Sequence, residues 1–160
     1  HAGGPAMRLT IRTNLAMRTL MFCAVNRGRT VRKSQIAALC NASENHLGVV
    51  VNMLSQSGYV ATARGRHGGM KLARAPEEIS VGEVFRLFEA CVPFAECFAT
   101  DANACPLSDA CRLRRALADA VEAFYAALDR ITLADLVDGN DPLADILGLP
   151  APGAVPQGCA

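Results

Sequence analysis

The sequence predicts a mainly α-helical fold with a small β-hairpin wing: a winged helix-turn-helix followed by a long C-terminal dimerisation helix. Three observations support this prediction. Two short helical segments are joined by a tight connection, a Gly-rich basic hairpin follows them, and a long amphipathic segment begins after Cys111. With 160 residues, of which 51% are hydrophobic, the chain suffices for one such domain and an appendage.

Helical spacing of apolar residues places the first helix in LAMRTLMFCAV, residues 15–25. A short helix is predicted in SQIAALCN, residues 34–41. The next segment, SENHLGVVVNMLSQSG, begins at Ser43, a favourable N-cap, and closes at Gly58, a favourable residue after a helix end. Two short helices joined by about three residues, the second capped and polar at its start, predict a helix-turn-helix.

A β-hairpin is predicted in YVATARGRHGGMKLAR, with strands at 59–64 and 70–74 around the basic tip GRHGG. Beside a helix-turn-helix, such a hairpin is typical of a wing. A helix in the major groove and an arginine-bearing hairpin on the backbone or in the minor groove can dock together on DNA. The pattern therefore favours double-stranded DNA as a partner.

Two further helices follow the hairpin. SVGEVFRLFEA starts with Ser80 and carries Glu83 three residues on, which is the pattern of a capping box. The segment RLRRALADAVEAFYAALDRI, after Cys111, is long and strongly amphipathic, and its apolar stripe is too long for a small domain to bury alone. We therefore predict a dimerisation helix and a homodimer that reads a two-fold DNA site. The stripe consists of Leu113, Leu117, Ala120, Val121, Phe124, Leu128 and Ile131.

The charge of the chain is divided between its two halves. Residues 7–74 hold 11 lysines and arginines against one acidic residue, a formal charge of +10, whereas residues 75–160 hold 5 basic and 14 acidic residues, a formal charge of −9. A basic first half indicates a polyanionic partner, and charge alone leaves nucleic acid, an anionic membrane surface and an acidic protein open. No stretch approaches the roughly 18 apolar residues of a membrane span, so no transmembrane helix is expected. The helix-turn-helix and the wing favour DNA over a membrane as the partner.

Candidate DNA-contacting residues lie in three places. Asparagine can bond to adenine edges, serine and histidine can meet bases or phosphates, and arginines concentrated on a loop favour phosphates. Ser43 could instead serve only as a cap, and Glu44 would repel phosphates unless it met a cytosine. The candidates are Arg8 and Arg12 near the first helix, Ser43, Asn45 and His46 at the start of the second helix of the motif, and Arg64, Arg66 and His67 on the wing.

Three of the seven cysteines, Cys97, Cys105 and Cys111, lie in one polar stretch, CFATDANACPLSDAC. Without a signal peptide we expect a reducing cytoplasm, where disulfides are rare, and an odd number of cysteines also argues against full pairing. Iron–sulfur clusters take thiolate ligands at loose spacing, whereas structural zinc usually prefers closer C-x₂₋₄-C pairs, which this stretch lacks. The pattern favours a cluster, with a zinc or thiol redox switch and a non-DNA iron–sulfur carrier as alternatives. Cys23 and Cys40 are expected to pack in the core.

These segments, in this order, resemble the Rrf2 family of dimeric winged-helix transcription regulators, many of which hold iron–sulfur clusters. The resemblance covers nearly all of residues 7–149 and rests on MRLTIRTNLAMRTLM, LSQSGYVATARGRHGGMKLAR, VGEVFRLFE, the three cysteines and ACRLRRALADAVEAFYAALDRITLADLV. Two branches are similar, the nitric-oxide-sensing NsrR repressors and the iron-responsive RirA repressors, both of the [4Fe–4S] kind. The long helix favours the first branch, while MFCAVN and AECF favour the second. We expect a [4Fe–4S] repressor that senses nitric oxide, with iron as the alternative signal.

The resemblance also implies a fourth cluster ligand. In the NsrR branch an aspartate of the partner subunit, near the start of the first helix, can complete the site. The matching position in TIRTNLAMR is Asn14, whose amide oxygen is a poor iron ligand beside a carboxylate. The fourth ligand is then expected to be water, a small thiol or another side chain. Nearby candidates are Cys91, Glu96, Asp101 and Asp109.

The expected division of the chain follows from these segments. No nucleophile–base pair, phosphate-cradling loop or carboxylate pair stands out, so we do not expect an enzyme. The first residues, HAGGPA, precede Met7 and look like a tag remnant. The expected parts are this remnant (1–6), the winged helix-turn-helix DNA-binding domain (7–75), a connecting helix with the cluster-binding cysteine loop (76–112), the dimerisation helix with C-terminal turns (113–149) and a disordered tail (150–160).

Overall fold

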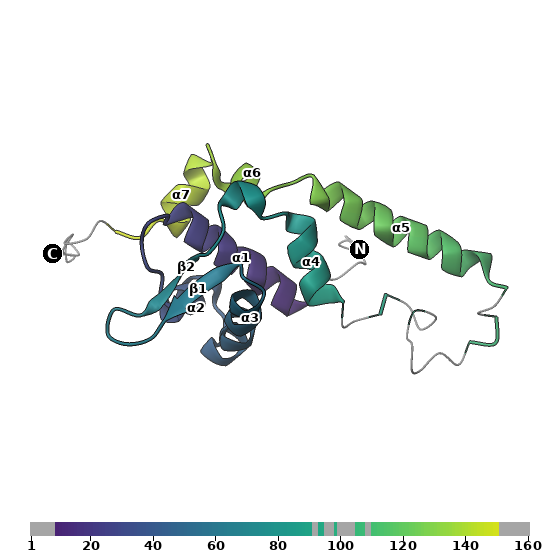
Figure 1. The fold of residues 1–160 in the computed structure, drawn as a ribbon, viewed down its shortest axis with the longest axis horizontal. Coiled ribbons are helices and arrows are strands. Elements are labelled where there is room, and N and C mark those ends of the chain that lie inside the picture. The colour runs from purple at the N-terminus through teal and green to yellow at the C-terminus, as the bar shows by residue number, and fades with distance from the viewer. Residues whose placement is uncertain (1–8, 91–92, 95–97, 99–104, 108–109, 151–160) are drawn as a thin grey trace, which may run out of the picture.

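The computed structural model describes residues 9–90, 93–94, 98, 105–107 and 110–150. The predicted fold class, mainly helical with a small β-hairpin, is confirmed (Figure 1). The predictions for Arg8, Cys97, the four nearby ligand candidates, the first six residues and nearly all of the tail lie outside the described residues. The elements are α1 (Ile11–Val25), α2 (Lys33–Cys40), α3 (Glu44–Gln56), β1 (Val60–Ala63), β2 (Gly69–Leu72), η1 (Pro76–Glu78), α4 (Val81–Glu89), α5 (Arg112–Asp129), α6 (Leu133–Val137) and α7 (Asp141–Leu147).

The helix-turn-helix is formed by α2 and α3. Helix α2 ends at Asn41, which adopts the left-handed conformation with φ 49° and lets the chain turn sharply. Helix α3 begins after Ser43, whose hydroxyl accepts a hydrogen bond from the His46 N–H at 3.2 Å, as its predicted N-cap role requires. Helix α1 begins earlier than predicted because Thr10 caps it, accepting from the Thr13 N–H.

The wing is an antiparallel pair of strands in which Val60 faces Leu72 and Ala63 faces Gly69. Each strand is slightly shorter than predicted. The wing is joined to the segment after α1 by a bridge between Val31 and Met70, whose N–H groups each donate to the other's carbonyl at 2.9 and 2.7 Å. Gly69 has φ +150°, and a Cβ there would lie 2.5 Å from the Val31 carbonyl oxygen, so this close approach requires glycine.

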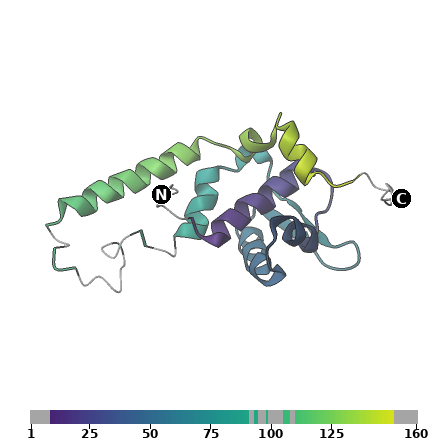
Figure 2. The same cartoon turned by 180° about the vertical axis from the view of Figure 1, so that it is seen from behind.

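The main core continues from the helix-turn-helix into α4 and α6. Helix α1 lies at its centre and is buried on most sides (Figures 1 and 2). Apolar residues of α3, α4 and α6 pack around it, for example Leu54, Val84 and Leu133, each 0% exposed. A smaller cluster under the wing joins Phe22, Cys23, Val31, Ile36, Ala37, Leu47, Val51 and Met70. The core of the predicted DNA-binding part, residues 7–75, therefore includes side chains from the later helices α4 and α6.

Among the described residues, the long helix α5 packs on α4 through its C-terminal half. Phe124 packs against Phe85 of α4 with ring centroids 6.3 Å apart, and the preceding half of α5 extends beyond α4 (Figures 1 and 2). Arg86 of α4 forms ion pairs with Asp129 and with Glu122, the latter at 3.1 Å. A Cβ on Gly82 would collide with the Asp129 side chain and lie 2.8 Å from the Asp129 backbone nitrogen, so glycine leaves room for the end of α5 at this contact. No helix among the described residues is long and apolar enough to cross a membrane.

The C-terminal segment returns to the end of α1. Asn26 is buried, its amide donates to the carbonyls of Phe22 and Leu147 at 2.9 Å, and its side-chain oxygen accepts from the Leu149 N–H at 2.8 Å. Arg29 donates to the Leu149 carbonyl at 2.8 Å as well. The C-terminal turns predicted within residues 113–149 are the short helices α6 and α7, which begin after the N-caps Thr132 and Asn140. These bonds fasten the end of the described chain to the segment between α1 and α2.

Candidate nucleic-acid interface and cysteine site

Helix α3 has one buried face and one exposed face. Leu47, Val50 and Leu54 are each 0% exposed and hold the helix against the core. Ser43, Asn45 and His46 are exposed at its start, where the sequence placed them as DNA-contacting candidates. The Ser43 hydroxyl oxygen accepts the cap bond, and its proton remains able to donate to a phosphate. The N-terminal end of α3 therefore presents polar groups to solvent.

Glu44, the acidic residue in this end of α3, is paired. Its carboxylate lies 3.9 Å from the Nζ atom of Lys33 at the start of α2. Both side chains are exposed, so the pair adds at most about 1 kcal/mol to folding stability. Its greater effect is on the surface potential, since Lys33 offsets the charge by which Glu44 would repel a phosphate.

The wing tip carries exposed positive charge. Arg64, Arg66 and His67 are all exposed, and the Gly68 N–H donates to the Gly65 carbonyl at 3.0 Å to close the turn. Arg32, which precedes α2, donates to the Arg66 carbonyl at 2.8 Å and so links the tip to the helix-turn-helix. Within the described part of the chain, no acidic side chain pairs with the arginines of the tip. Such unneutralised arginines suit phosphate contacts.

Arg12, the remaining described candidate, is exposed on the first turn of α1. Asn14 is exposed on the same turn. Both lie beside a contact that the sequence did not predict. The Glu89 carboxylate, at the end of α4, accepts hydrogen bonds from the Thr10 N–H at 3.0 Å, from the Thr10 hydroxyl at 3.1 Å and from the buried Thr13 hydroxyl. A carboxylate at this position also stabilises the positive end of the α1 dipole.

Two of the three predicted cluster ligands, Cys105 and Cys111, are described, and both are half-buried. Cys111 is the N-cap residue of α5, with φ −81° and ψ 105°, and its side chain makes no capping hydrogen bond. Cys111 therefore lies at the positive end of the dipole of an 18-residue helix. Within the described segments no three histidine, cysteine, aspartate or glutamate side chains come together as a metal site. The two thiols are donors of the kind that a cluster takes, and the third lies outside the described residues.

The two cysteines expected in the core are found there. Cys23 is 3% exposed, and burial raises the pKa of its thiol to about 12, so it stays protonated near neutral pH and is a poor ligand. Cys40 is half-buried and packs against both apolar clusters. The core-packing prediction is confirmed for both.

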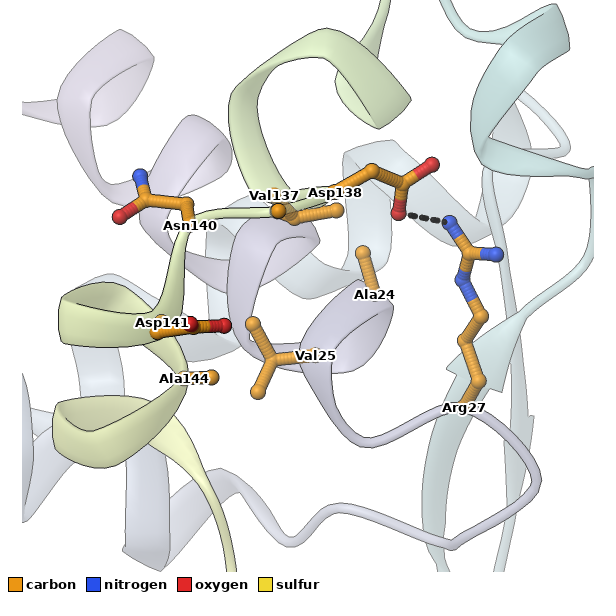
Figure 3. Close-up of a pocket in the computed structure, with 9 residues that line it drawn as sticks. Ala24, Val25, Arg27, Val137, Asp138, Asn140, Asp141 and Ala144 are labelled. Carbon is orange, nitrogen blue, oxygen red and sulfur yellow. Dashed lines mark hydrogen bonds and ion pairs between the residues drawn. The ribbon is translucent and has the colours of Figure 1, made fainter.

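A hollow of about 290 Å³ lies beside the C-terminal end of α1 (Figure 3). Asn14 lies in the first turn of the same helix. The ion pair between Arg27 and Asp138, 3.0 Å apart, stands on one side of the hollow. Its lining comes from the end of α1 and the connection between α6 and α7: Ala24, Val25, Arg27, Val137, Asp138, Gly139, Asn140, Asp141 and Ala144. The hollow contains none of the predicted DNA-contacting or cluster-binding residues.

Comparison with known proteins gives consistent matches over most of the chain. Residues 9–139 match the Rrf2 family, described as "Iron-dependent Transcriptional regulator". The HTH-type transcriptional regulator NsrR of Geobacillus kaustophilus is 43% identical over 142 residues, covering 88% of this chain and 97% of that protein. NsrR of Bacillus subtilis is 41% identical with the same coverage of each chain. The solved structure of CymR, the global cysteine regulator of B. subtilis, is 26% identical and covers 82% of this chain and 96% of its own, with a TM-score of 0.61.

Proposed function

The chain belongs to the Rrf2 family of transcriptional regulators, and from this premise we propose that it is a cytoplasmic homodimeric repressor whose operator binding depends on a [4Fe–4S] cluster and responds to nitric oxide. The regulator function and the winged-helix fold follow from the family. The cluster, its ligands, the dimer and the signal are the content of the proposal. The NsrR name of the two relatives, at 43% and 41% identity, supports nitric oxide as the signal.

The DNA-binding part of the proposal uses α3 and the wing. Asn45 and His46 are placed on the exposed start of α3, where residues of a recognition helix meet base edges. Arg64 and Arg66 are placed on the wing tip, where they would neutralise phosphates. The bond from Arg32 to the wing tip links the wing to the start of α2.

The cluster would be held by Cys97, Cys105 and Cys111. When bound, an iron–sulfur cluster supplies iron atoms with which nitric oxide reacts. The chain contributes thiolates, and Cys111 is suited to this role because it lies at the positive end of α5 and makes no capping bond. Asn14 at the partner-subunit position leaves the fourth ligand to water, a small thiol or another side chain.

One observation carries the link between the cysteines and DNA binding. The segment that contains the proposed cluster ligands, residues 90–111, follows α4 directly in the sequence. It ends at Cys111, the N-cap residue of α5. Glu89, the last residue of α4, is hydrogen-bonded to the first turn of α1, which is the central helix of the DNA-binding core. A change in the cysteine segment would therefore act on α1 at one end and on the dimer helix at the other. In a dimer that spans two half-sites, a small rotation of the two recognition helices weakens specific binding.

An iron-responsive repressor is the second candidate. Asn14 favours it, because an amide in place of a carboxylate departs from the NsrR pattern and matches the RirA branch. A zinc or thiol switch would use the same cysteines without a cluster. Metal content and the response to nitric oxide separate the three.

The first test is native mass spectrometry of protein purified without oxygen, followed by binding to duplex DNA enriched by the protein from a random pool. We expect a dimer with one [4Fe–4S] mass per subunit, and loss of DNA binding after anaerobic nitric oxide. The Cys105→Ser variant should lose the cluster mass, while Cys40→Ser, at a half-buried core position, should keep it.

The outcomes separate the candidates. A holo-dimer that keeps its DNA after excess nitric oxide but releases it under iron chelation would favour the iron-responsive function. Zinc, or no metal at all under anaerobic handling, would contradict the cluster and favour the thiol switch, with the regulator function unchanged.

A further inference from the structure

Resting on the proposed function, we propose that α3 selects A·T base pairs, with Asn45 and Asn52 recognising adenine edges and Val49 contacting a thymine methyl group. This proposal names the sequence class of the operator, which the charge distribution does not specify. It depends on the arrangement of a few side chains on the outer face of α3.

The outward face of α3 consists of Asn45, Val49, Asn52 and Gln56, all of them exposed. Their spacing, i, i+4, i+7 and i+11, places them in one row along a helix of 3.6 residues per turn. The row lies opposite the buried face, because Leu47, Val50, Val51 and Leu54 occupy the other side. Val49 is 44% exposed, and it is the one apolar member of the row.

The chemistry of this row matches one kind of base pair. An asparagine amide both donates and accepts, and it can bond to adenine N6 and N7 together. A valine methyl can pack against the C5 methyl group of thymine. Guanine is read most often by arginine or lysine, and neither occurs in α3. Cytosine would need a carboxylate, and Glu44 is turned to Lys33 at the flank of the helix.

Gly48 supports a close approach of DNA to this face. A Cβ at Gly48 would meet only the Lys33 Nζ atom, at 3.7 Å, so packing within the chain does not require glycine here. A glycine inside a helix disfavours the helix by about 1 kcal/mol relative to alanine. It sits three residues after Asn45 and one before Val49, where a missing side chain lets these two reach further into a groove. Close approach to DNA would explain the glycine at position 48, whereas packing within the chain does not require it.

Basic side chains flank this row of α3, and the row itself contains none. Lys33 lies beside the start of α3, and Arg32 is bonded to the wing tip that carries Arg64 and Arg66. Phosphate contacts fix orientation and carry no base information, whereas neutral donors and methyl groups in the groove carry it. The division of charged flank and neutral face therefore fits a helix that reads bases. Gln56 lies about 16 Å along the axis from Asn45, too far from the helix start to share its base pairs.

The test begins with selection of duplexes from a random pool and then replaces single groups on the selected DNA. Thymine is replaced by uracil, which removes only the C5 methyl group, and adenine by 7-deaza-adenine, which removes the N7 acceptor. We expect A·T pairs at the centre of each half-site and an affinity loss of about fivefold or more for each replacement at a contacted base. The Val49→Ala variant should be indifferent to uracil. Asn45→Ala should be indifferent to 7-deaza-adenine at one position of the half-site, and Asn52→Ala at another. Gln56→Ala is the matched control and should keep the sensitivity of the parent protein to both.

The result also separates this proposal from the proposed function. Selected half-sites centred on G·C pairs, or equal sensitivity to uracil in the parent protein and Val49→Ala, would overturn the A·T reading while DNA binding stands. If no duplex is enriched over the random pool, both fail. Circular dichroism of each variant shows whether the exposed substitutions keep the helical fold.

The Gly48→Ala variant provides a second measurement. This substitution should raise the melting temperature and weaken binding to the selected duplex, whereas stronger binding would contradict the close approach of DNA to α3.

Discussion

Helices α3 and α5 are both amphipathic, but the chain covers their apolar faces to different extents. The 13-residue α3 buries four side chains against the core, and its outer face is polar apart from Val49. The 18-residue α5 buries none. Leu113, near its start, is 65% exposed, although it belongs to the same stripe as Phe124, which packs on α4.

The difference separates two uses of an apolar face. The core of the same chain covers the whole apolar face of α3. This packing fixes the helix in place and leaves its opposite side available for a ligand. In α5 the nine-residue α4 reaches only the second half of the stripe, and described residues leave Leu113 in solvent. A long stripe that one chain leaves uncovered is typical of an assembly surface, and the proposed partner is a second copy.

The largest expected effect is on folding and comes from α3. The Leu54→Ala variant removes a side chain that is 0% exposed and should lower the free energy of unfolding by about 2–5 kcal/mol. Val49→Ala, on the exposed side of the same helix, should change it by no more than about 0.5 kcal/mol. Urea denaturation of both variants at two protein concentrations measures this contrast. Equal losses would mean that the two faces of α3 are not distinct.

The next effect is on assembly and comes from α5. Leu117→Gln places an amide in the apolar stripe, and in a two-fold interface each substitution acts twice. We expect the dimer to weaken about 100-fold, since each lost leucine contact is worth about 1.5 kcal/mol or more. Sedimentation equilibrium measures the dissociation constant. Arg115→Gln introduces the same side chain on the opposite side of the helix and should leave the dimer intact; a comparable loss there would place the interface elsewhere.

The sequence predicted what depends on local chemistry. Ser43 as a cap, Gly58 at a helix end, the Gly-rich turn of the wing and the 3.6-residue period of α5 are each decided within a few residues. The order of elements and the exposed wing arginines followed from these. The DNA-contacting candidates that the structure describes are all on the surface, and their role in binding stays a prediction.

Contacts between distant segments could not be predicted in this way. The Glu89 bonds to Thr10 and Thr13 join residues more than 70 positions apart, and no local pattern marks them. Glu83 was expected to complete a capping box with Ser80, but its carboxylate lies 3.7 Å from Arg74 instead. Spacing within a turn of helix identifies an N-cap, whereas the partner of a charged side chain depends on how the elements pack.

A smaller effect concerns the start of α3. Ser43→Ala removes the hydroxyl that accepts from the His46 N–H and should cost about 1 kcal/mol of folding stability. Ser43→Asp restores an acceptor and should recover it. Chemical denaturation measures both variants, and salt-dependent DNA binding distinguishes them further, because the added carboxylate should repel phosphates. If Ser43→Ala keeps full stability, the cap bond does not contribute to the free energy of unfolding. DNA contact is then the remaining predicted role of Ser43.

The smallest expected effect has the opposite sign and concerns the start of α5. Cys111 occupies the N-cap position but makes no capping bond, whereas serine is among the preferred N-cap residues. Cys111→Ser should therefore stabilise the metal-free protein by about 0.5 kcal/mol, seen as a small rise in the melting temperature, while removing a proposed cluster ligand. A rise in stability together with loss of the iron absorbance would mean that Cys111 is present for cluster binding, at a small cost in the stability of α5. If the variant is less stable without metal, Cys111 supports the fold directly, and its thiol has a structural role that the N-cap geometry does not explain.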